Sequence, residues 1–407
     1  MQKLAKKRRI RFESEYNLFL EGHTSKVSSI ATTSDSLLMV TGSHDKTIRI
    51  WSLQEQKQLS YLKGHTSAVK TIFITSDNKY IFSGSEDKTI IQWNLSEKLQ
   101  ESIFKGHTLT VSTIATTSDN KILVSGSWDT TIRFWDIKNK QQIIVLEGHT
   151  NVITAVTITN DNKFAISGSW DMTIIIWDLN EKNKSNVLEI IDIQINCICL
   201  TNINQFLIIG SDKEIRVWNV YERILEVELF GHNNKVSCVS VSKDDQYAVT
   251  GSWDNTVRVW NLTSKIMESV LEGHSSYVNC VKIINNDKMI VSGSNDNSII
   301  LWSLDKRRIL TVFEGHISTV NDIIIGNDRK YAVTWSGDKT VRVWNLISKL
   351  EHMIFKNHDF KIYSVAMTKN NRFVVSGYKK KFVRIWSMSK AYKHTDFRTR
   401  LALNYLK

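Results

Sequence analysis

The stretch LEGHTNVITAVTITNDNKFAISGSWDMTIIIWDL, at residues 146–179, carries the pattern that decides the fold of this chain. Short runs in which apolar and polar residues alternate are separated in it by Asp, Asn, Ser and Gly. The preceding stretch has such runs at Val111–Thr116, Ile122–Ser127 and Thr131–Trp135, and a fourth run, Gln142–Leu146, leads into the stretch quoted. Alternation with a period of two, broken by turn-forming residues, is typical of β-strands. The sequence therefore predicts units of four short strands.

The unit repeats along the chain with a period of 42 residues. Gly-His pairs end at His23, His65, His107, His149, His232, His274 and His316, and an Asn-His pair ends at His358. The strand-ending tryptophans are Trp51, Trp93, Trp135, Trp177, Trp218, Trp260, Trp302, Trp344 and Trp386. Six residues before the first eight of these stand Asp45, Asp87, Asp129, Asp171, Asp212, Asp254, Asp296 and Asp338. The gap from His149 to His232 is almost two periods long, so one more unit lies inside it and the chain contains nine.

Four strands in about 40 residues are typical of one blade of a β-propeller. The units resemble the WD-repeat β-propeller family over about residues 16–390, and residues 146–179 lie close to its consensus. In that family the His before the first strand, a Ser or Thr on the second, the Asp of the next turn and the Trp of the third strand form a hydrogen-bonded set. In the third unit the hydroxyl would come from Ser125 or Ser127. The resemblance implies the same structural network for His107, Asp129, Trp135, His149, Asp171, Trp177, His232, Asp254 and Trp260.

The expected fold is therefore all-β, a single WD-repeat propeller with nine repeats. The residues Phe19–Gly22 match Tyr61–Gly64, so residues 16–21 are expected to form a fourth strand that completes the last blade. Such closure removes the exposed edges of an open sheet. Because propellers usually have about four to eight blades, a smaller ring with surplus repeats is the alternative.

Three segments follow from this interpretation: a basic extension at 1–15, the propeller at 16–390 and a basic tail at 391–407. The repeats lie near 23–64, 65–106, 107–148, 149–190, 191–231, 232–273, 274–315, 316–357 and 358–390. Repeat 5 has Ile190-Ile191 in place of Gly-His, and repeat 9 has Lys380 in place of the aspartate. Either sequence drift or a specialised role explains these two departures.

The net charge of +12 is concentrated at the two ends of the chain, which carry ten of these charges. The nearly neutral body is therefore not a basic groove for nucleic acid. Three interpretations of residues 1–12 remain open: a targeting sequence, an electrostatic tether, or an inert end. A tether would bind nucleic acid, an acidic cytoskeletal surface or membrane lipid. Residues 397–407 are expected to form a short docking helix. No apolar run is long enough to predict a transmembrane segment.

Nothing in the sequence indicates catalysis, a metal site or a cofactor. The four cysteines, Cys197, Cys199, Cys238 and Cys280, lack the spacing of a zinc site and are too few for a disulfide framework. Phosphate-loop, nucleophile-elbow and His-Glu-x-x-His motifs do not occur, and most His and Asp residues occupy network positions. We therefore expect a protein that is not an enzyme, with propeller catalysis as a remote alternative.

One face of the predicted ring is the candidate partner-binding site. In family members that bind peptides, contacts often come from the residues three and five after the His and from the residue just before the Asp. Those positions hold the aromatic residues Trp128, Trp170, Trp253, Tyr277 and Tyr363 and the lysines Lys26, Lys70, Lys235, Lys361 and Lys379. The face would be aromatic on one arc and basic on the other, although Trp at this turn is also compatible with simple packing on the neighbouring loop. Trp335 takes a glycine position instead, so we expect it to be packed.

These features favour a non-catalytic scaffold that binds peptide segments or protein partners, some with acidic stretches, and organises a multiprotein complex. The alternative is a WD-repeat factor held on nucleic acid, cytoskeleton or a membrane surface by its basic ends. We expect an intracellular, cytoplasmic protein, and the basic N-terminus leaves a nuclear location open.

Overall fold

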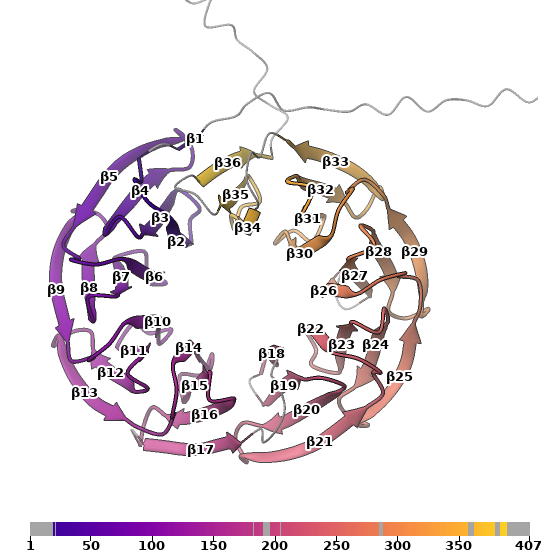
Figure 1. Ribbon diagram of the computed structural model, residues 1–407, viewed down its shortest axis with the longest axis horizontal. Helices are drawn as coiled ribbons and strands as arrows, with labels where there is room; N and C mark the ends of the chain where they lie inside the picture. Colours follow the sequence, from indigo (N-terminus) through magenta and orange to yellow (C-terminus); the bar gives the residue numbers. More distant parts are fainter. Residues whose placement is uncertain are drawn as a thin grey trace, which may run out of the picture.

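The chain forms a ring of nine four-stranded antiparallel sheets arranged around a central hole (Figure 1). The computed structural model describes residues 19–20, 22–181, 183–189, 196–203, 205–284, 288–356, 362–378 and 383–388, and of residues 19, 20, 183–189, 363 and 378 it describes the backbone alone. All the regular secondary structure in these residues is β-strand. The prediction of an all-β, nine-bladed propeller is confirmed, and a smaller ring with surplus repeats is excluded.

Each blade is a meander whose first strand lines the central hole and whose fourth strand lies on the outer rim (Figure 1). The first strands are β2 (Val27–Thr32), β6 (Val69–Ile74), β10 (Val111–Thr116), β14 (Ile153–Ile158), β18 (Cys197–Leu200), β22 (Val236–Val241), β26 (Val278–Ile284), β30 (Val320–Ile325) and β34 (Ile362–Met367). The second strands are β3 (Leu38–Ser43), β7 (Tyr80–Ser85), β11 (Ile122–Ser127), β15 (Phe164–Ser169), β19 (Phe206–Gly210), β23 (Tyr247–Ser252), β27 (Met289–Ser294), β31 (Tyr331–Ser336) and β35 (Phe373–Tyr378). The third strands are β4 (Thr47–Ser52), β8 (Thr89–Asn94), β12 (Ile132–Asp136), β16 (Thr173–Asp178), β20 (Glu214–Asn219), β24 (Val257–Asn261), β28 (Ile299–Ser303), β32 (Val341–Asn345) and β36 (Val383–Ser387). The fourth strands are β5 (Lys57–Lys63), β9 (Leu99–Lys105), β13 (Gln141–Leu146), β17 (Asn183–Glu189), β21 (Ile224–Phe230), β25 (Ile266–Leu271), β29 (Arg308–Phe313) and β33 (Leu350–Phe355).

The ninth blade takes its outer strand from the N-terminal part of the chain. The strand β1 (Phe19–Leu20) pairs antiparallel with β36, with Phe19 opposite Arg384 and Leu20 opposite Val383. The strand expected at residues 16–21 is described only at these two positions. The sheet therefore has the order β1-β36-β35-β34 and joins the two ends of the propeller.

The hydrophobic core is divided among the junctions between neighbouring blades. At the junction of blades 2 and 3, for example, Trp135 packs edge-on against Phe104, with ring centroids 5.6 Å apart. In most blades the second strand comes close to the first strand of the next blade. A Cβ added to Gly126 would lie 2.6 Å from Ile153, so only glycine fits at this position without displacing the next blade.

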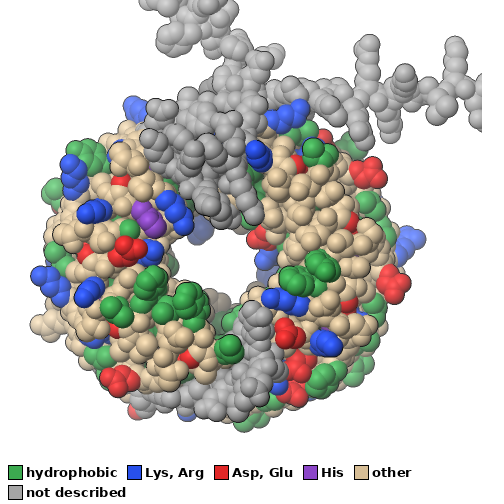
Figure 2. Space-filling model, viewed as in Figure 1, with side chains coloured by type: hydrophobic (Ala, Val, Ile, Leu, Met, Phe, Trp, Pro, Cys, Tyr) green, Lys and Arg blue, Asp and Glu red, His purple; other side chains and the backbone are tan. Residues whose placement is uncertain are grey.

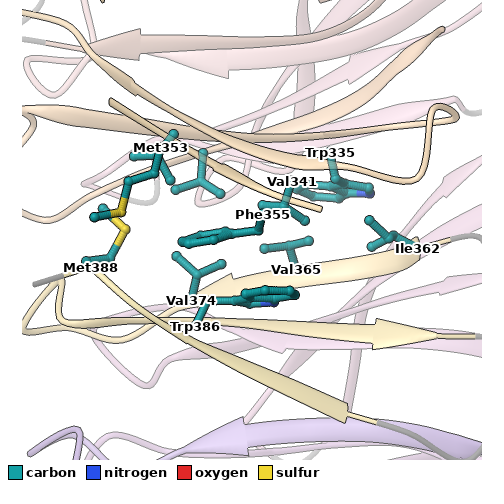
Figure 3. Close-up of a cluster of buried hydrophobic side chains, with 11 residues drawn as sticks. Trp335, Val341, Met353, Phe355, Ile362, Val365, Val374, Trp386 and Met388 are labelled. Carbon is teal, nitrogen blue, oxygen red and sulfur yellow. The ribbon is translucent and has the colours of Figure 1, made fainter. Parts of the chain in front are cut away.

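Blade 8 solves the same packing problem in a different way. Where blade 6 has Gly251-Ser-Trp253, blade 8 has Trp335-Ser-Gly337, so the large and small residues have exchanged places. Trp335 is only 6% exposed and lies in the core between blades 8 and 9, near the stacked rings of Phe355 and Trp386 (Figure 3). The prediction that Trp335 is packed is therefore confirmed.

The chain has no proline, and the turns that the structure describes contain no glycine in the left-handed region. All the described residues with positive φ are other types, including Asn78 (φ 58°), Asn162 (φ 59°) and Thr130 (φ 68°). Asn and Asp, which accept this conformation more easily than other residues with a Cβ, hold seven of these positions, and Lys and Arg hold ten. The sequence thus forms sharp turns at the cost of local strain where the residue is β-branched.

A chain of amide hydrogen bonds joins neighbouring blades at the turns between the first and second strands. The Ser118 amide donates to Asn162 Oδ1 at 2.8 Å, and Asn162 Nδ2 donates to Ser118 Oγ at 2.8 Å. Ser34 and Asn78 repeat the arrangement at 2.9 and 2.8 Å. Such bonds fix each blade to the next on the side of the ring opposite to the aspartate turns.

Candidate partner-binding face

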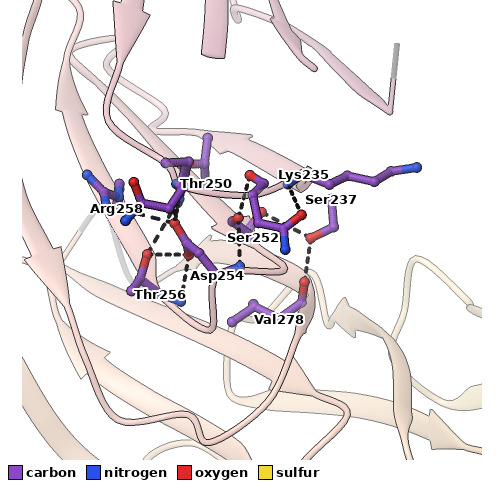
Figure 4. A network of polar contacts seen from close by, with 12 residues as sticks. Lys235, Ser237, Thr250, Ser252, Asp254, Thr256, Arg258 and Val278 are labelled. Atoms are coloured by element: carbon purple, nitrogen blue, oxygen red, sulfur yellow. Dashed lines mark hydrogen bonds and ion pairs between the residues drawn. The ribbon is translucent and has the colours of Figure 1, made fainter. Parts of the chain in front are cut away.

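The turns on this face are held by the predicted network, which blade 6 illustrates (Figure 4). The His232 imidazole bonds Asp254 Oδ2 through Nδ1 at 2.7 Å and Thr250 Oγ1 through Nε2 at 2.8 Å. The same hydroxyl accepts the indole N–H of Trp260 at 2.8 Å. Asp254 Oδ1 accepts the Thr256 hydroxyl at 2.6 Å and its amide at 2.9 Å, which closes the turn. Each buried polar group therefore has a partner.

The same network forms in seven blades of the described structure. The structure brings together the residues assigned in blades 3 and 4, and in blade 3 the hydroxyl belongs to Ser125. Ser127 has another role, since its hydroxyl accepts the Asp129 amide at 3.0 Å. Blades 1, 2, 7 and 8 contain the sets His23–Thr41–Asp45–Trp51, His65–Ser83–Asp87–Trp93, His274–Ser292–Asp296–Trp302 and His316–Thr334–Asp338–Trp344.

Burial fixes the protonation of the network. Burial lowers the pKa of His107 more than its hydrogen bond to Asp129 raises it. Burial would raise the pKa of Asp129, but its bonds to His107, Thr131 and the Thr108 amide together hold that pKa well below the usual value. A neutral imidazole that donates from Nδ1 and accepts at Nε2 satisfies every member. The histidines and aspartates of the network are therefore part of the structural framework of their blades.

Blade 5 departs from this arrangement, and blade 9 is described only in part. In blade 5, Ile208 occupies the hydroxyl position, so the buried indole nitrogen of Trp218 has no hydrogen-bond partner among the residues that the structure describes. The missing histidine was apparent from the sequence, whereas the missing hydroxyl was overlooked. In blade 9, Trp386 donates to Ser376 Oγ at 3.0 Å, while His358 and Lys380 lie outside the described residues.

In seven blades of the described structure a backbone hydrogen bond places the candidate contact positions side by side. The amide of Trp128 donates to the carbonyl of Thr110 at 2.9 Å, and that of Trp170 donates to Val152 at 3.0 Å. The residue before the aspartate is thereby fixed next to the residue three after the histidine. We call the face that these positions share the upper face.

Two of the predicted tryptophans are exposed on neighbouring blades of the upper face. Trp170 is 66% exposed and Trp128 is 40% exposed, and the nearby Leu109 and Met172 are also exposed. Figure 2 shows hydrophobic side chains gathered beside the central hole over β10–β11 and β14–β15. We call these four residues the aromatic arc. Sequence reasoning overlooked Leu109 and Met172, because both lie one or two positions away from the slots considered.

Lys70, one of the predicted contact lysines, is not a free cation. Its ammonium lies 3.0 Å from Glu86 Oε1 and 5.6 Å from the ring centroid of Trp128. The bond to Lys70 is the main cause that lowers the pKa of Glu86. Lys70 therefore joins blades 2 and 3 and covers part of Trp128.

A second aromatic cluster lies on blades 6 and 7. Trp253 stacks on Tyr277 with centroids 5.0 Å apart and an interplanar angle of 11°, and the Lys235 ammonium lies 5.1 Å from the Trp253 ring. Lys235 therefore lies beside Trp253. Because these rings already contact one another, Trp170 is the most accessible of the predicted aromatic residues whose side chains are described.

The remaining predicted contacts are only partly described. Lys26 is exposed on blade 1. Lys361 and Lys379 lie outside the described residues, and the side chain of Tyr363 is not described. The fifth position after the histidine often bonds the next blade, as where Ser112 Oγ donates to the Ile153 carbonyl at 2.5 Å.

The described residues contain no group of His, Cys, Asp and Glu side chains able to hold a metal ion. The four cysteines are free thiols. Burial raises the pKa of Cys238 to about 12, and burial likewise raises the pKa of Cys197 and Cys280. These thiols therefore remain protonated, which suits small packed residues better than nucleophiles or metal ligands.

The fold and the repeated network define a WD-repeat propeller, and the comparisons with known proteins agree. The sequence matches the WD40 family, described as WD domain, G-beta repeat, and the chain belongs to this family. The matches cover residues 14–52, 56–94, 98–136, 140–178, 191–219, 224–261, 266–303, 307–345 and 349–387.

Two similar proteins share a part of the repeat region and the fold, respectively. Guanine nucleotide-binding protein subunit beta-5b of Danio rerio is 48% identical over 46 residues, which are 11% of this chain and 12% of that protein. The crystal structure of the computationally designed Ika8 protein superposes with a TM-score of 0.59 at 22% identity, covering 91% of this chain and 98% of that one. This second likeness shows the fold alone. No helix among the described residues has the length and apolar character needed to cross a membrane.

Proposed function

We propose that the protein is a non-catalytic scaffold that binds peptide segments or protein partners on the upper face and organises a multiprotein complex inside the cell. The observation that carries this proposal is the exposure of Trp170, held in a fixed turn beside a second exposed tryptophan. Large aromatic side chains that are exposed on a rigid surface are typical centres of protein interfaces. The four free thiols suit a reducing compartment.

The geometry supports an apolar or cationic anchor on the aromatic arc. Covering one tryptophan removes roughly 100 Å² or more of apolar surface from water, worth about 2–3 kcal/mol. Lys70 already lies over Trp128, which shows that a cation can bind against this ring. A partner with a Leu, Met, Phe, Lys or Arg side chain at its centre fits these properties.

The test is partner capture from the native cell by the full chain and by the Trp128→Ala/Trp170→Ala variant, followed by mass spectrometry. Leu350→Ala is the matched control, because Leu350 is 65% exposed and begins the outer strand β33 opposite Asn345, at the end of the blade away from the aspartate turn. We expect the double variant to keep its melting temperature and lose its partners, and the control to keep them. Capture of the same proteins by the double variant would refute the proposal.

A further inference from the structure

His44 gives blade 1 a different chemistry from the aromatic arc. It occupies the position before Asp45, where blades 3, 4 and 6 have tryptophan. Its amide donates to the Lys26 carbonyl at 2.8 Å, so the two residues are fixed next to one another at one turn. Lys26 is exposed and His44 is half-buried.

The charges of this region are not balanced. Glu86 is the nearby acid, and its two oxygens are occupied by the Lys70 ammonium at 3.0 Å and the Ser67 hydroxyl at 3.2 Å. Lys26 has no acidic partner among the described residues. Figure 2 shows histidine, basic and acidic side chains adjacent to one another on this part of the ring, over β2 and β6. A positive charge therefore remains available for an external anion.

The protonation of His44 responds to these neighbours. Burial, followed by the charges of Lys70 and Lys26, lowers the pKa of His44, and Glu86 opposes them. The imidazole is therefore neutral at pH 7 in the free protein. A carboxylate placed between Lys26 and His44 would favour the protonated imidazole and raise this pKa.

We propose that Lys26 and His44 bind a carboxylate of an acidic peptide segment, whose apolar part lies on Trp128 and Trp170. This inference rests on the proposed function and adds the direction in which the partner lies, from blade 4 toward blade 1. A peptide fits better than nucleic acid. A phosphate backbone needs several free cations, whereas this surface offers few among the described residues and also contains Glu86.

The first experiment is a selection from a random 12-residue peptide library displayed on phage against the full chain at pH 6. We expect enriched peptides to combine an aromatic or aliphatic residue with Asp or Glu several positions away. Lys26→Gln/His44→Gln should lose the acidic preference and keep the apolar one. Lys138→Gln removes an equal charge from an exposed turn of blade 3 and should change nothing. These variants keep both basic ends of the chain, so acidic peptides that bind those ends would still be selected. Acidic peptides that persist with the Lys26/His44 variant would therefore overturn the proposal.

The second experiment measures the affinity of one selected peptide by fluorescence anisotropy between pH 7.5 and 5.5. The peptide carboxylates stay ionised in this range, since Glu titrates near pH 4.3. If the pKa of His44 rises on binding, affinity must increase as the pH falls, by roughly threefold to tenfold over the range. His44→Gln should remove this increase. An equal pH dependence in the His44→Gln variant would overturn the role of His44.

The failure of this inference differs from the failure of the proposed function. Peptides that depend on the aromatic arc but lack acidic residues would support the proposed function and contradict the carboxylate site. A selection that enriches nothing dependent on Trp128 and Trp170 would contradict both.

Discussion

At the scale of single residues, the tryptophan of the third strand is used for both packing and hydrogen bonding. Trp135 fills the core between blades 2 and 3, and its indole N–H satisfies Ser125 at 2.8 Å. The same residue type serves differently at Trp170, which is exposed, and at Trp335, which replaces a glycine. Position within the repeat therefore decides what a tryptophan does.

We predict that Trp135→Ala destabilises the protein by about 3–5 kcal/mol, because it opens a cavity and leaves the Ser125 hydroxyl short of a donor. Trp135→Phe should cost less, since it keeps most of the apolar contact. Denaturant unfolding of the full chain measures both. An unchanged melting temperature for Trp135→Ala would show that the network is assigned wrongly.

The repeat revealed these residues from the sequence, but contacts between blades could not be read from it. Both Ser125 and Ser127 fit the position of the hydroxyl in the repeat. Only the strand register shows that Ser125 faces the histidine. The position of Lys70 over Trp128, which belongs to the next blade, depends on how neighbouring blades are offset, and the repeat period does not specify this offset.

At the scale of elements, the turn between the second and third strands shows how this chain forms sharp turns without glycine. Thr130 has φ 68° in blade 3, whereas Asn255 has φ 71° at the equivalent place in blade 6. A β-branched residue is poorly suited to this conformation, and Asn tolerates it.

We predict that Thr130→Asn stabilises the protein by about 0.5–1 kcal/mol and that the reciprocal Asn255→Thr destabilises it by a similar amount. Thermal unfolding of the two variants against the parent chain gives the sign. A loss of stability in Thr130→Asn would mean that the Thr130 side chain makes contacts worth more than the strain.

Strands were the most predictable elements, because alternation and turn residues recur with each repeat. The amide bonds between Ser118 and Asn162 were not foreseen, since the two residues are a full repeat apart. Blade 5 lacks both the histidine and the hydroxyl of the network, because Ile208 takes the place of the hydroxyl residue that would accept the Trp218 indole N–H.

At the scale of the whole molecule, nine blades closed by β1 make a ring whose stability depends on pH. Burial is the largest effect on the pKa of His23, His107, His232 and His316, and it lowers that pKa although the partner aspartates oppose it. The unfolded chain, with imidazole pKa values near 6.5, then binds more protons than the folded ring as the pH falls below about 6.5. The network aspartates, whose pKa values are also lowered, add a further loss below about pH 4.

We therefore predict that the melting temperature decreases steadily from pH 7.5 to pH 5 at constant ionic strength. Differential scanning calorimetry measures this directly. A melting temperature that rises over the same range would contradict the neutral state of the buried histidines. Asp322, whose pKa is raised by burial, acts in the opposite direction and belongs to a single blade.

The central claim is that the upper face of a rigid ring, at the aromatic arc, receives the partner. Hydrogen–deuterium exchange of the full chain with and without a captured partner tests it most directly. The account predicts slower exchange at residues 127–131 and 169–173, with no change in β9 and β13, the outer strands of blades 2 and 3. Protection of the outer strands, with the turns at 127–131 and 169–173 unaffected, would contradict it.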